Sequence, residues 1–161
     1  TVQDCDLILL LVRPEVIKEV LCEIREYITE KHLIVSVAAG VKISKIESFL
    51  PSGSKVCRIM INLQIQSCVG TSAVARGSYC TDEDASFMQK FMSSLGYCIE
   101  LPESNFDAFT ALSGSGPAFI YGVIEALAEG ATLQGIPRKY SIEIATHMVR
   151  GSAIHALVTL I

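Results

Sequence analysis

Residues 33–46 read LIVSVAAGVKISKI, and this stretch decides the fold class. Its first five residues form a short, nearly continuous apolar run, which is typical of a strand buried on both faces. Ala38-Ala39-Gly40 then make a small-residue turn. Ser44-Lys45-Ile46-Glu47 has the form of a capping box and predicts a short helix to Leu50. A buried strand, a tight turn and a helix in this order indicate an α/β fold.

The same alternation of strands and helices continues on both sides of this stretch. Pro14 suits a first helical turn, and apolar residues recur at helical spacing from Val16 to Ile28. Buried strands that alternate with helices predict a mostly parallel sheet with right-handed crossovers. The further expected elements are strands at 6–12, 55–61, 70–76 and 97–101, and a helix at 81–95.

The pattern changes after Pro102. Only helical periodicity is visible from Ser104 to Ile161, with a break at Gly135-Ile136-Pro137. We therefore place a domain boundary near residue 102, which gives an α/β domain over residues 1–102 and an all-helical domain over residues 103–161.

The composition excludes some classes of function. The net charge is −4 and no basic cluster occurs, which argues against nucleic-acid binding. The longest apolar run, Leu7 to Val12, is far shorter than the roughly 20 residues that cross a bilayer, so no membrane is expected. Half of the residues are hydrophobic, however, and this favours covered strands or a subunit interface, with a homo-oligomer as the expected assembly.

Cysteine and histidine usage predicts no metal site. The six cysteines form no CxxC pair and no zinc spacing with histidine, so we expect buried, reduced thiols and an intracellular protein. The expected compartment is the cytoplasm rather than mitochondria. His32 is expected at a strand edge. His147 and His155 lie eight residues apart, which fits a shared surface or interface face, and no third ligand accompanies them.

Small residues cluster at 112–119, which read LSGSGPAF inside an otherwise helical pattern. Glycine weakens a helix interior by about 1 kcal/mol and proline by about 3 kcal/mol, so the cluster needs a reason. Either the backbone approaches a ligand or another chain closely, or the helix bends there. Glu103 and Asp107 precede the cluster and lie four residues apart, which is one turn, at an expected helix start. They fit the dipole of a helix start, or Glu103 faces a crevice and contacts an amine or imine.

Open parallel sheets bind ligands at the carboxyl ends of their strands. Three such ends are expected here, at Val12-Arg13-Pro14, Ala38-Ala39-Gly40 and Met60-Ile61-Asn62. Arg13 suits a phosphate, Gly40 allows close backbone approach, and Asn62 offers a donor and acceptors. The GxGxxG phosphate loop is absent from these 161 residues, so a complete dinucleotide site would need a further βαβ unit upstream.

The sequence resembles the pyrroline-5-carboxylate reductase family. The resemblance runs from about Asp6 to Gly151. It is carried by LVRP, IVSVAAGVKIS, VCRIMIN, DAFTALSGSGPAFIY and EALAEGATLQGIPR, in that order. It implies a Rossmann-type domain at 1–102, a helical dimerisation domain at 103–161, and reduction of 1-pyrroline-5-carboxylate to proline with NADPH or NADH. The implied partners are a small imine substrate and a second copy of the chain.

The resemblance also implies the site residues. The expected cofactor-binding residues are Leu11, Val12, Arg13, Pro14, Val37, Ala38, Ala39, Gly40, Met60 and Asn62. The expected substrate-binding residues are Glu103, Ser113, Gly114, Ser115 and Gly116.

Three departures from the family pattern bear on activity. The usual MxNTP segment reads Met60-Ile61-Asn62-Leu63-Gln64, and the family lysine is Arg13. The loop with the catalytic threonine has no clear match. Residues 145–157 are either the ordinary helix after GIPR, or 151–157 match the family's GGATIHAL with Ala153 at the threonine position. Both readings predict an inactive fragment of a reductase. The alternative is a catalytically dead dimerisation or interaction protein.

Overall fold

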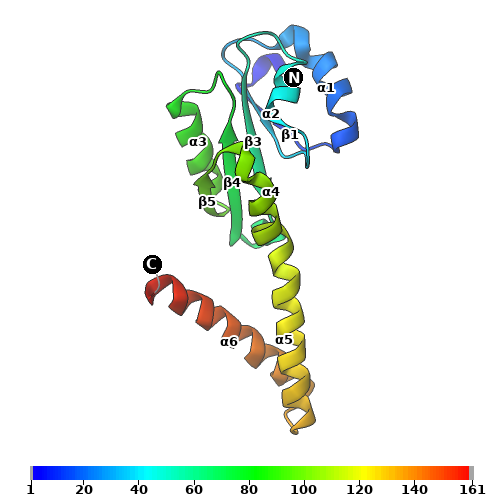
Figure 1. The fold of residues 1–161 in the computed structure, drawn as a ribbon, viewed down its shortest axis with the longest axis vertical. Coiled ribbons are helices and arrows are strands. Elements are labelled where there is room, and N and C mark those ends of the chain that lie inside the picture. The colour runs from blue at the N-terminus through cyan, green and yellow to red at the C-terminus, as the bar shows by residue number, and fades with distance from the viewer. Residues whose placement is uncertain (1, 160–161) are drawn as a thin grey trace. The chain divides into compact units, whose positions relative to one another are not determined.

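The computed structural model describes residues 2–159 and contains a five-stranded sheet followed by helices (Figure 1). The strands are β1 (Leu7–Leu10), β2 (Leu33–Ser36), β3 (Lys55–Ile61), β4 (Gly70–Arg76) and β5 (Gly96–Glu100), and they neighbour one another in chain order. The α-helices are α1 (Ile17–Ile24), α2 (Ile43–Glu47), α3 (Asp82–Ser93), α4 (Phe106–Phe109), α5 (Gly116–Leu133) and α6 (Arg138–Thr159). The predicted α/β class with a following helical region is confirmed.

The sheet is mostly parallel, as predicted, with one antiparallel pair. β1, β2 and β3 run parallel to one another, β4 runs antiparallel to β3, and β5 is parallel to β4. Only a short 3₁₀ helix, Leu63–Ser67, connects β3 to β4. A connection of this length is too short for a parallel crossover, so the chain reverses direction there.

Helices cover both faces of the sheet. Ile17 of α1 and Ile46 of α2 pack with Ile34 and Val56 on one face, and Phe106 of α4 joins this cluster. Met88 of α3 packs against the strands on the opposite face. Because successive strand residues point to opposite faces, β2 and β3 supply both clusters and read as continuous apolar runs.

The ends of several elements differ from the predictions. β1 ends at Leu10 instead of residue 12, and the helix expected from Pro14 to Ile28 is α-helical only at Ile17–Ile24. The 3₁₀ turns Pro14–Val16 and Arg25–Tyr27 flank it, since the first and last turns of a helix readily tighten.

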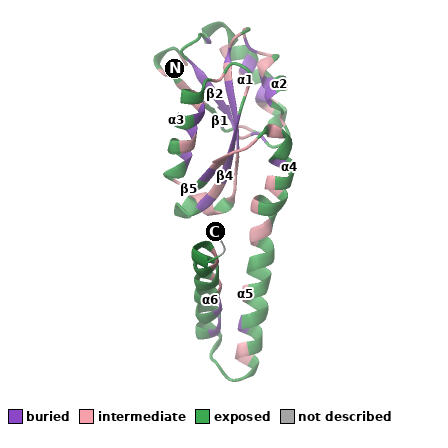
Figure 2. Ribbon diagram, turned by 60° about the vertical axis from the view of Figure 1, so that its left-hand side comes forward, coloured by how far each residue is buried: buried purple, intermediate pink, exposed green. Residues whose placement is uncertain are grey.

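The chain forms two compact units, unit 1 at Thr1–Gly114 and unit 2 at Ser115–Ile161. The division falls twelve residues beyond the boundary expected near residue 102, because Phe106 is only 1% exposed within the core of unit 1. Unit 2 consists of α5 and α6, and Figure 2 shows both helices almost entirely exposed.

Candidate functional site

Three of the predicted site segments leave the sheet at the same edge. The parallel registers pair Leu10 with Ser36 and Ser36 with Arg58. Residues 11–14 and 37–40 follow the carboxyl ends of β1 and β2, and 60–62 contain the carboxyl end of the neighbouring strand β3. This is the edge at which open α/β sheets bind ligands. The structure thus brings the expected cofactor-binding segments together in unit 1.

The segments after β1 and β2 border a cavity of about 650 Å³. Pro14 and Gly40 line it, together with the side chains of Lys18, Lys42 and Lys45. Three ammonium groups give this hollow a positive character that suits an anionic ligand.

A side-chain hydrogen bond and a glycine shape the turn after β2. The Ala38 N–H donates to Ser36 Oγ at 3.2 Å, and Gly40 has a φ of 73°, in the left-handed region that favours glycine. Ala38 is buried, and Val12 and Val37 are partly buried. The other expected residues here are exposed, namely Leu11, Arg13, Pro14, Ala39 and Gly40.

Asn62 connects the end of β3 to two other segments. Its Oδ1 accepts a hydrogen bond from the Thr71 N–H at 2.9 Å, and its Nδ2 donates to the Ser113 carbonyl oxygen at 3.2 Å. Both ends of the amide are therefore engaged. Asn62 acts here as a clamp between β3, β4 and the small-residue cluster, although the sequence suggested only a ligand contact.

The small-residue cluster forms a π-helix at Thr110–Ser115, where each turn is wider than in an α-helix. A Cβ atom on Gly114 would lie 2.8 Å from Met60 Cε, so this backbone lies against the tip of the Met60 side chain. The helical irregularity of the cluster is thus a widened turn. Its close approach to a ligand or another chain stays a prediction.

Ser113 presents an unused hydroxyl at this position. Its Oγ is buried and has no hydrogen-bond partner among residues 2–159. An unpaired buried hydroxyl is costly, and a polar ligand group would satisfy it. Ser113 therefore fits the substrate or nicotinamide contact that the resemblance implies, and π-helical turns are frequent at functional sites.

Glu103 is tied to the fold through one of its carboxylate oxygens. Oε1 accepts from Arg58 Nη1 at 2.9 Å and from the Ile43 N–H at 2.9 Å. Arg58 also lies over the Phe106 ring, 5.0 Å from its centroid. The predicted imine contact of Glu103 stays a prediction.

Arg58 was not predicted as a functional or structural residue. Its signal was present in the sequence, as one charged residue in the middle of the apolar strand 55–61.

The remaining predicted residues lie in unit 2. Ser115 and Gly116 open it, and Ala153 lies within the uninterrupted helix α6 rather than in a loop. His147 and His155 are exposed on α6, as expected. No group of three metal-ligating side chains occurs in the part of the chain that the structure describes.

Two expectations for single residues were wrong. His32 precedes β2 and is 1% exposed, with Nδ1 accepting from the Thr29 N–H, because the turn before the strand folds over it. Cys22 and Cys68 are exposed, since one lies on the outer side of α1 and the other follows the 3₁₀ helix between β3 and β4.

Comparisons with known proteins identify the family. Residues 103–159 match the family description "Pyrroline-5-carboxylate reductase dimerisation". The chain is 40% identical to pyrroline-5-carboxylate reductase of Methanosarcina acetivorans over 158 residues, covering 98% of this chain and 58% of that protein. The chain belongs to the pyrroline-5-carboxylate reductase family. A second relative, pyrroline-5-carboxylate reductase 3 of Mus musculus, is 40% identical over 94% of this chain and 55% of its own length.

Solved structures of pyrroline-5-carboxylate reductases have the same fold. The enzyme of Coxiella burnetii superposes with a TM-score of 0.91 at 29% identity, covering 98% of this chain and 59% of that one. The Plasmodium falciparum enzyme, solved with NADP bound, superposes with a TM-score of 0.86 at 27% identity, covering 96% and 59%. The chain thus spans somewhat more than half the length of these relatives.

Proposed function

We propose that this chain carries part of the site of an NAD(P)H-dependent reductase that converts 1-pyrroline-5-carboxylate to proline. The observation that carries this proposal is the hydrogen bond between Asn62 Nδ2 and the Ser113 carbonyl. It joins the third strand end, expected at the cofactor, to the small-residue cluster, expected at the substrate. Two segments 51 residues apart thereby form one wall of a site.

The residues present fit such a cofactor in part. Residues 11–14 and 37–40 would hold it through their backbone, and the cavity lysines Lys18, Lys42 and Lys45 would attract its negative charge. The nicotinamide, when bound, supplies a hydride to the imine carbon. Ser113 would orient a polar group of cofactor or substrate through its unpaired Oγ.

The 161 residues lack a GxGxxG loop and a threonine in the expected catalytic position. We therefore expect the chain on its own to bind NADPH weakly and to turn over little 1-pyrroline-5-carboxylate. The test combines saturation-transfer NMR on the nicotinamide protons with a turnover assay. We expect saturation transfer to the nicotinamide protons of NADPH, together with little turnover of 1-pyrroline-5-carboxylate. Robust turnover would refute the inactivity, and the absence of transfer would refute the cofactor site.

A pair of glycine variants sharpens this test. Gly114→Ala places a methyl group against Met60 at the proposed site, whereas Gly122→Ala adds one in the middle of α5. We expect the first variant to weaken transfer to the nicotinamide and the second to leave it unchanged. Equal effects would show that the small-residue cluster is not part of the site.

Unit 2 supports a homodimer. Large apolar side chains such as Phe119, Leu127, Ile144 and Leu157 are exposed on α5 and α6. The helical stretch Glu103–Leu133 is long and apolar enough to cross a membrane, although the apolar runs in the sequence had predicted no such segment. Because its residues match a dimerisation domain, we assign this surface to a second copy of the chain rather than to lipid.

The second candidate is a reductase-like dimerisation protein without catalysis. Leu63 and Gln64 in place of threonine and proline, and Ala153 within a helix, favour it. A stable dimer that shows no transfer to nicotinamide would support this candidate. The cytoplasmic location stays a prediction under both.

A further inference from the structure

Two cysteines that are distant in the sequence meet in unit 1. Cys57 of β3 and Cys80, which immediately precedes the N-cap of α3, are 23 residues apart, and their sulfur atoms lie 3.6 Å apart. Cys57 is fully buried and Cys80 is partly exposed. A solvent-borne reagent therefore reaches Cys80 first, and Cys57 stands directly behind it.

The two thiols differ in acidity. Cys80 Sγ also lies 3.1 Å from the Val56 carbonyl oxygen, so the reduced pair forms a chain in which Cys57 donates to Cys80 and Cys80 donates to Val56. The bond from Cys57 holds the pKa of Cys80 below its ordinary value, although burial opposes this. The same bond, together with burial, raises the pKa of Cys57. Cys80 is thus the nucleophile, and Cys57 keeps its proton.

We propose that Cys57 and Cys80 are a redox-modification site that forms a reversible disulfide when the protein meets hydrogen peroxide. The Cys80 thiolate attacks the peroxide, the O–O bond breaks, and hydroxide leaves and takes up a proton as water. The Cys57 thiol then attacks the Cys80 sulfenic acid, the S–O bond breaks, and a second water leaves. Two thiols lose two electrons and two protons, and one peroxide becomes two waters.

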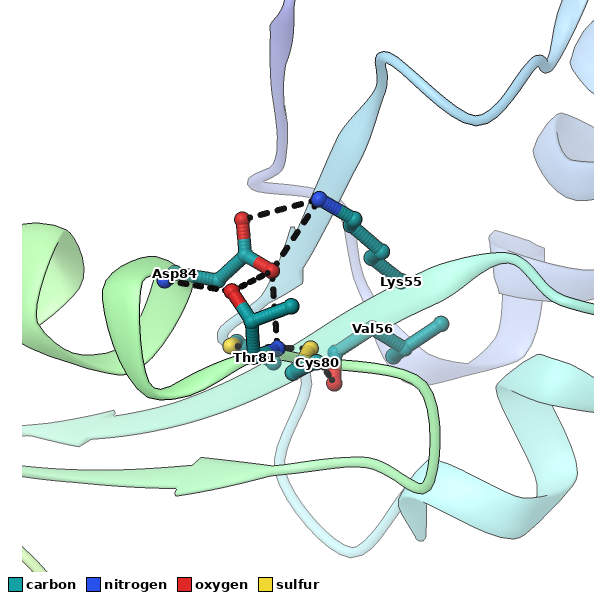
Figure 3. Close-up of polar contacts among 6 residues, drawn as sticks. Lys55, Val56, Cys80, Thr81 and Asp84 are labelled. Carbon is teal, nitrogen blue, oxygen red and sulfur yellow. Dashed lines mark hydrogen bonds and ion pairs between the residues drawn. The ribbon is translucent and has the colours of Figure 1, made fainter.

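The surrounding structure positions the pair for this step. A disulfide needs a sulfur–sulfur distance of about 2.05 Å, so the sulfurs must approach by about 1.5 Å. Thr81 and Lys55 bind the Asp84 carboxylate beside Cys80 and hold the start of α3 close to β3 (Figure 3). The Gly77 N–H donates to the Val56 carbonyl at 2.7 Å and holds the other end of the loop.

The other cysteines provide internal controls. Cys22 and Cys68 are more exposed than Cys80. No hydrogen-bond contact between two thiols other than Cys57–Cys80 occurs within residues 2–159. Exposure alone would direct oxidation to Cys22 and Cys68, whereas the proposal directs disulfide formation to the buried pair.

The test is oxidation of the purified chain with one equivalent of hydrogen peroxide, followed by alkylation under denaturing conditions and tryptic mass spectrometry. The expected product links peptide 56–58 to peptide 77–90, weighs two hydrogens less than the two free peptides, and disappears on reduction. The double variant C22S/C68S should give the same yield. Recovery of Cys57 and Cys80 as separate alkylated thiols, with oxidation confined to Cys22 or Cys68, would overturn the proposal.

Single serine variants assign the order of the steps. Cys57→Ser should leave a sulfenic acid on Cys80 that dimedone traps, whereas Cys80→Ser should leave Cys57 unoxidised. Oxidation of Cys57 at an unchanged rate in Cys80→Ser would contradict this order.

A measurement on the unaltered chain covers the case in which a serine variant fails to fold. Closing the loop between residues 57 and 80 should raise the melting temperature by about 10 °C, and reductant should reverse the rise. An unchanged melting temperature after oxidation would count against the disulfide.

Discussion

Unit 1 of this chain buries a core of large apolar side chains, whereas unit 2 exposes most of its large apolar side chains. Unit 1 buries Ile34, Val56 and Phe106 between helices and sheet. Among the described residues of unit 2, only Ala128, Ser141 and Ala145 are buried. Helices gain most of their stability from packing an apolar face rather than from propensity. Unit 1 therefore contains its own core, whereas unit 2 has the composition of a core without the second layer that would bury it.

The largest expected effect comes from comparing one phenylalanine in unit 1 with one in unit 2. Phe106→Ala removes a ring that is 1% exposed and should destabilise unit 1 by about 3–5 kcal/mol. Phe119→Ala removes a ring that is 74% exposed and should change unit 1 by less than about 0.5 kcal/mol. Hydrogen exchange of the β3 and β4 amides measures both effects. Similar losses of protection would show that the two units are not independent.

Two ion pairs give the next contrast. Arg58→Ala leaves Glu103 without its guanidinium partner and uncovers the Phe106 ring. Because the Arg58 side chain is 11% exposed and that of Glu103 25%, we expect a loss of about 2 kcal/mol, below the cost of breaking a fully buried pair. Arg138→Ala breaks the exposed pair with Glu125 in unit 2 and should cost less than about 0.5 kcal/mol.

Urea unfolding followed by circular dichroism measures both arginine variants. Arg58→Lys, which keeps the charge but not the planar group, should fall between wild type and Arg58→Ala. A loss for Arg138→Ala as large as that for Arg58→Ala would contradict the contrast.

The smallest expected effect is a pH dependence within unit 1. Burial disfavours the ionised form of Asp84, but hydrogen bonds from Thr81 and Lys55 outweigh it and hold the pKa of Asp84 below its ordinary 3.8. A carboxyl with a lowered pKa stabilises the folded state at pH values above 3.8, and this contribution is lost as the pH falls through the folded-state pKa.

Asp84→Asn should therefore be less stable than wild type near neutral pH, and the difference should shrink in acid. Thermal unfolding across this range measures it, with Asp82→Asn as the exposed control on the same turn. A difference in stability that stays constant at all pH values would show that ionisation of the Asp84 carboxyl does not stabilise the fold.

The local sequence predicted most of unit 1, because strand and helix signals are local. The bounds of β3 and β4 were correct, since a turn at 51–53 and Gly70 define where these strands begin. The clustering of three strand ends at one edge also followed from sheet topology.

Side-chain contacts between distant segments could not be predicted in this way. Arg58 meets Glu103 45 residues away, and Asn62 reaches Ser113 51 residues away. Such contacts depend on packing that no short window of sequence contains. The small residues at 112–119 indicated an irregularity, but the π-helix itself emerged only from the backbone.

The measurement that tests the central claim most directly is the mass of the purified chain in solution by light scattering. If a second copy of the chain covers the apolar surface of unit 2, the mass is twice 17.4 kDa, and Leu127→Glu lowers it toward one chain. A monodisperse monomer of 17.4 kDa at high protein concentration would contradict the account.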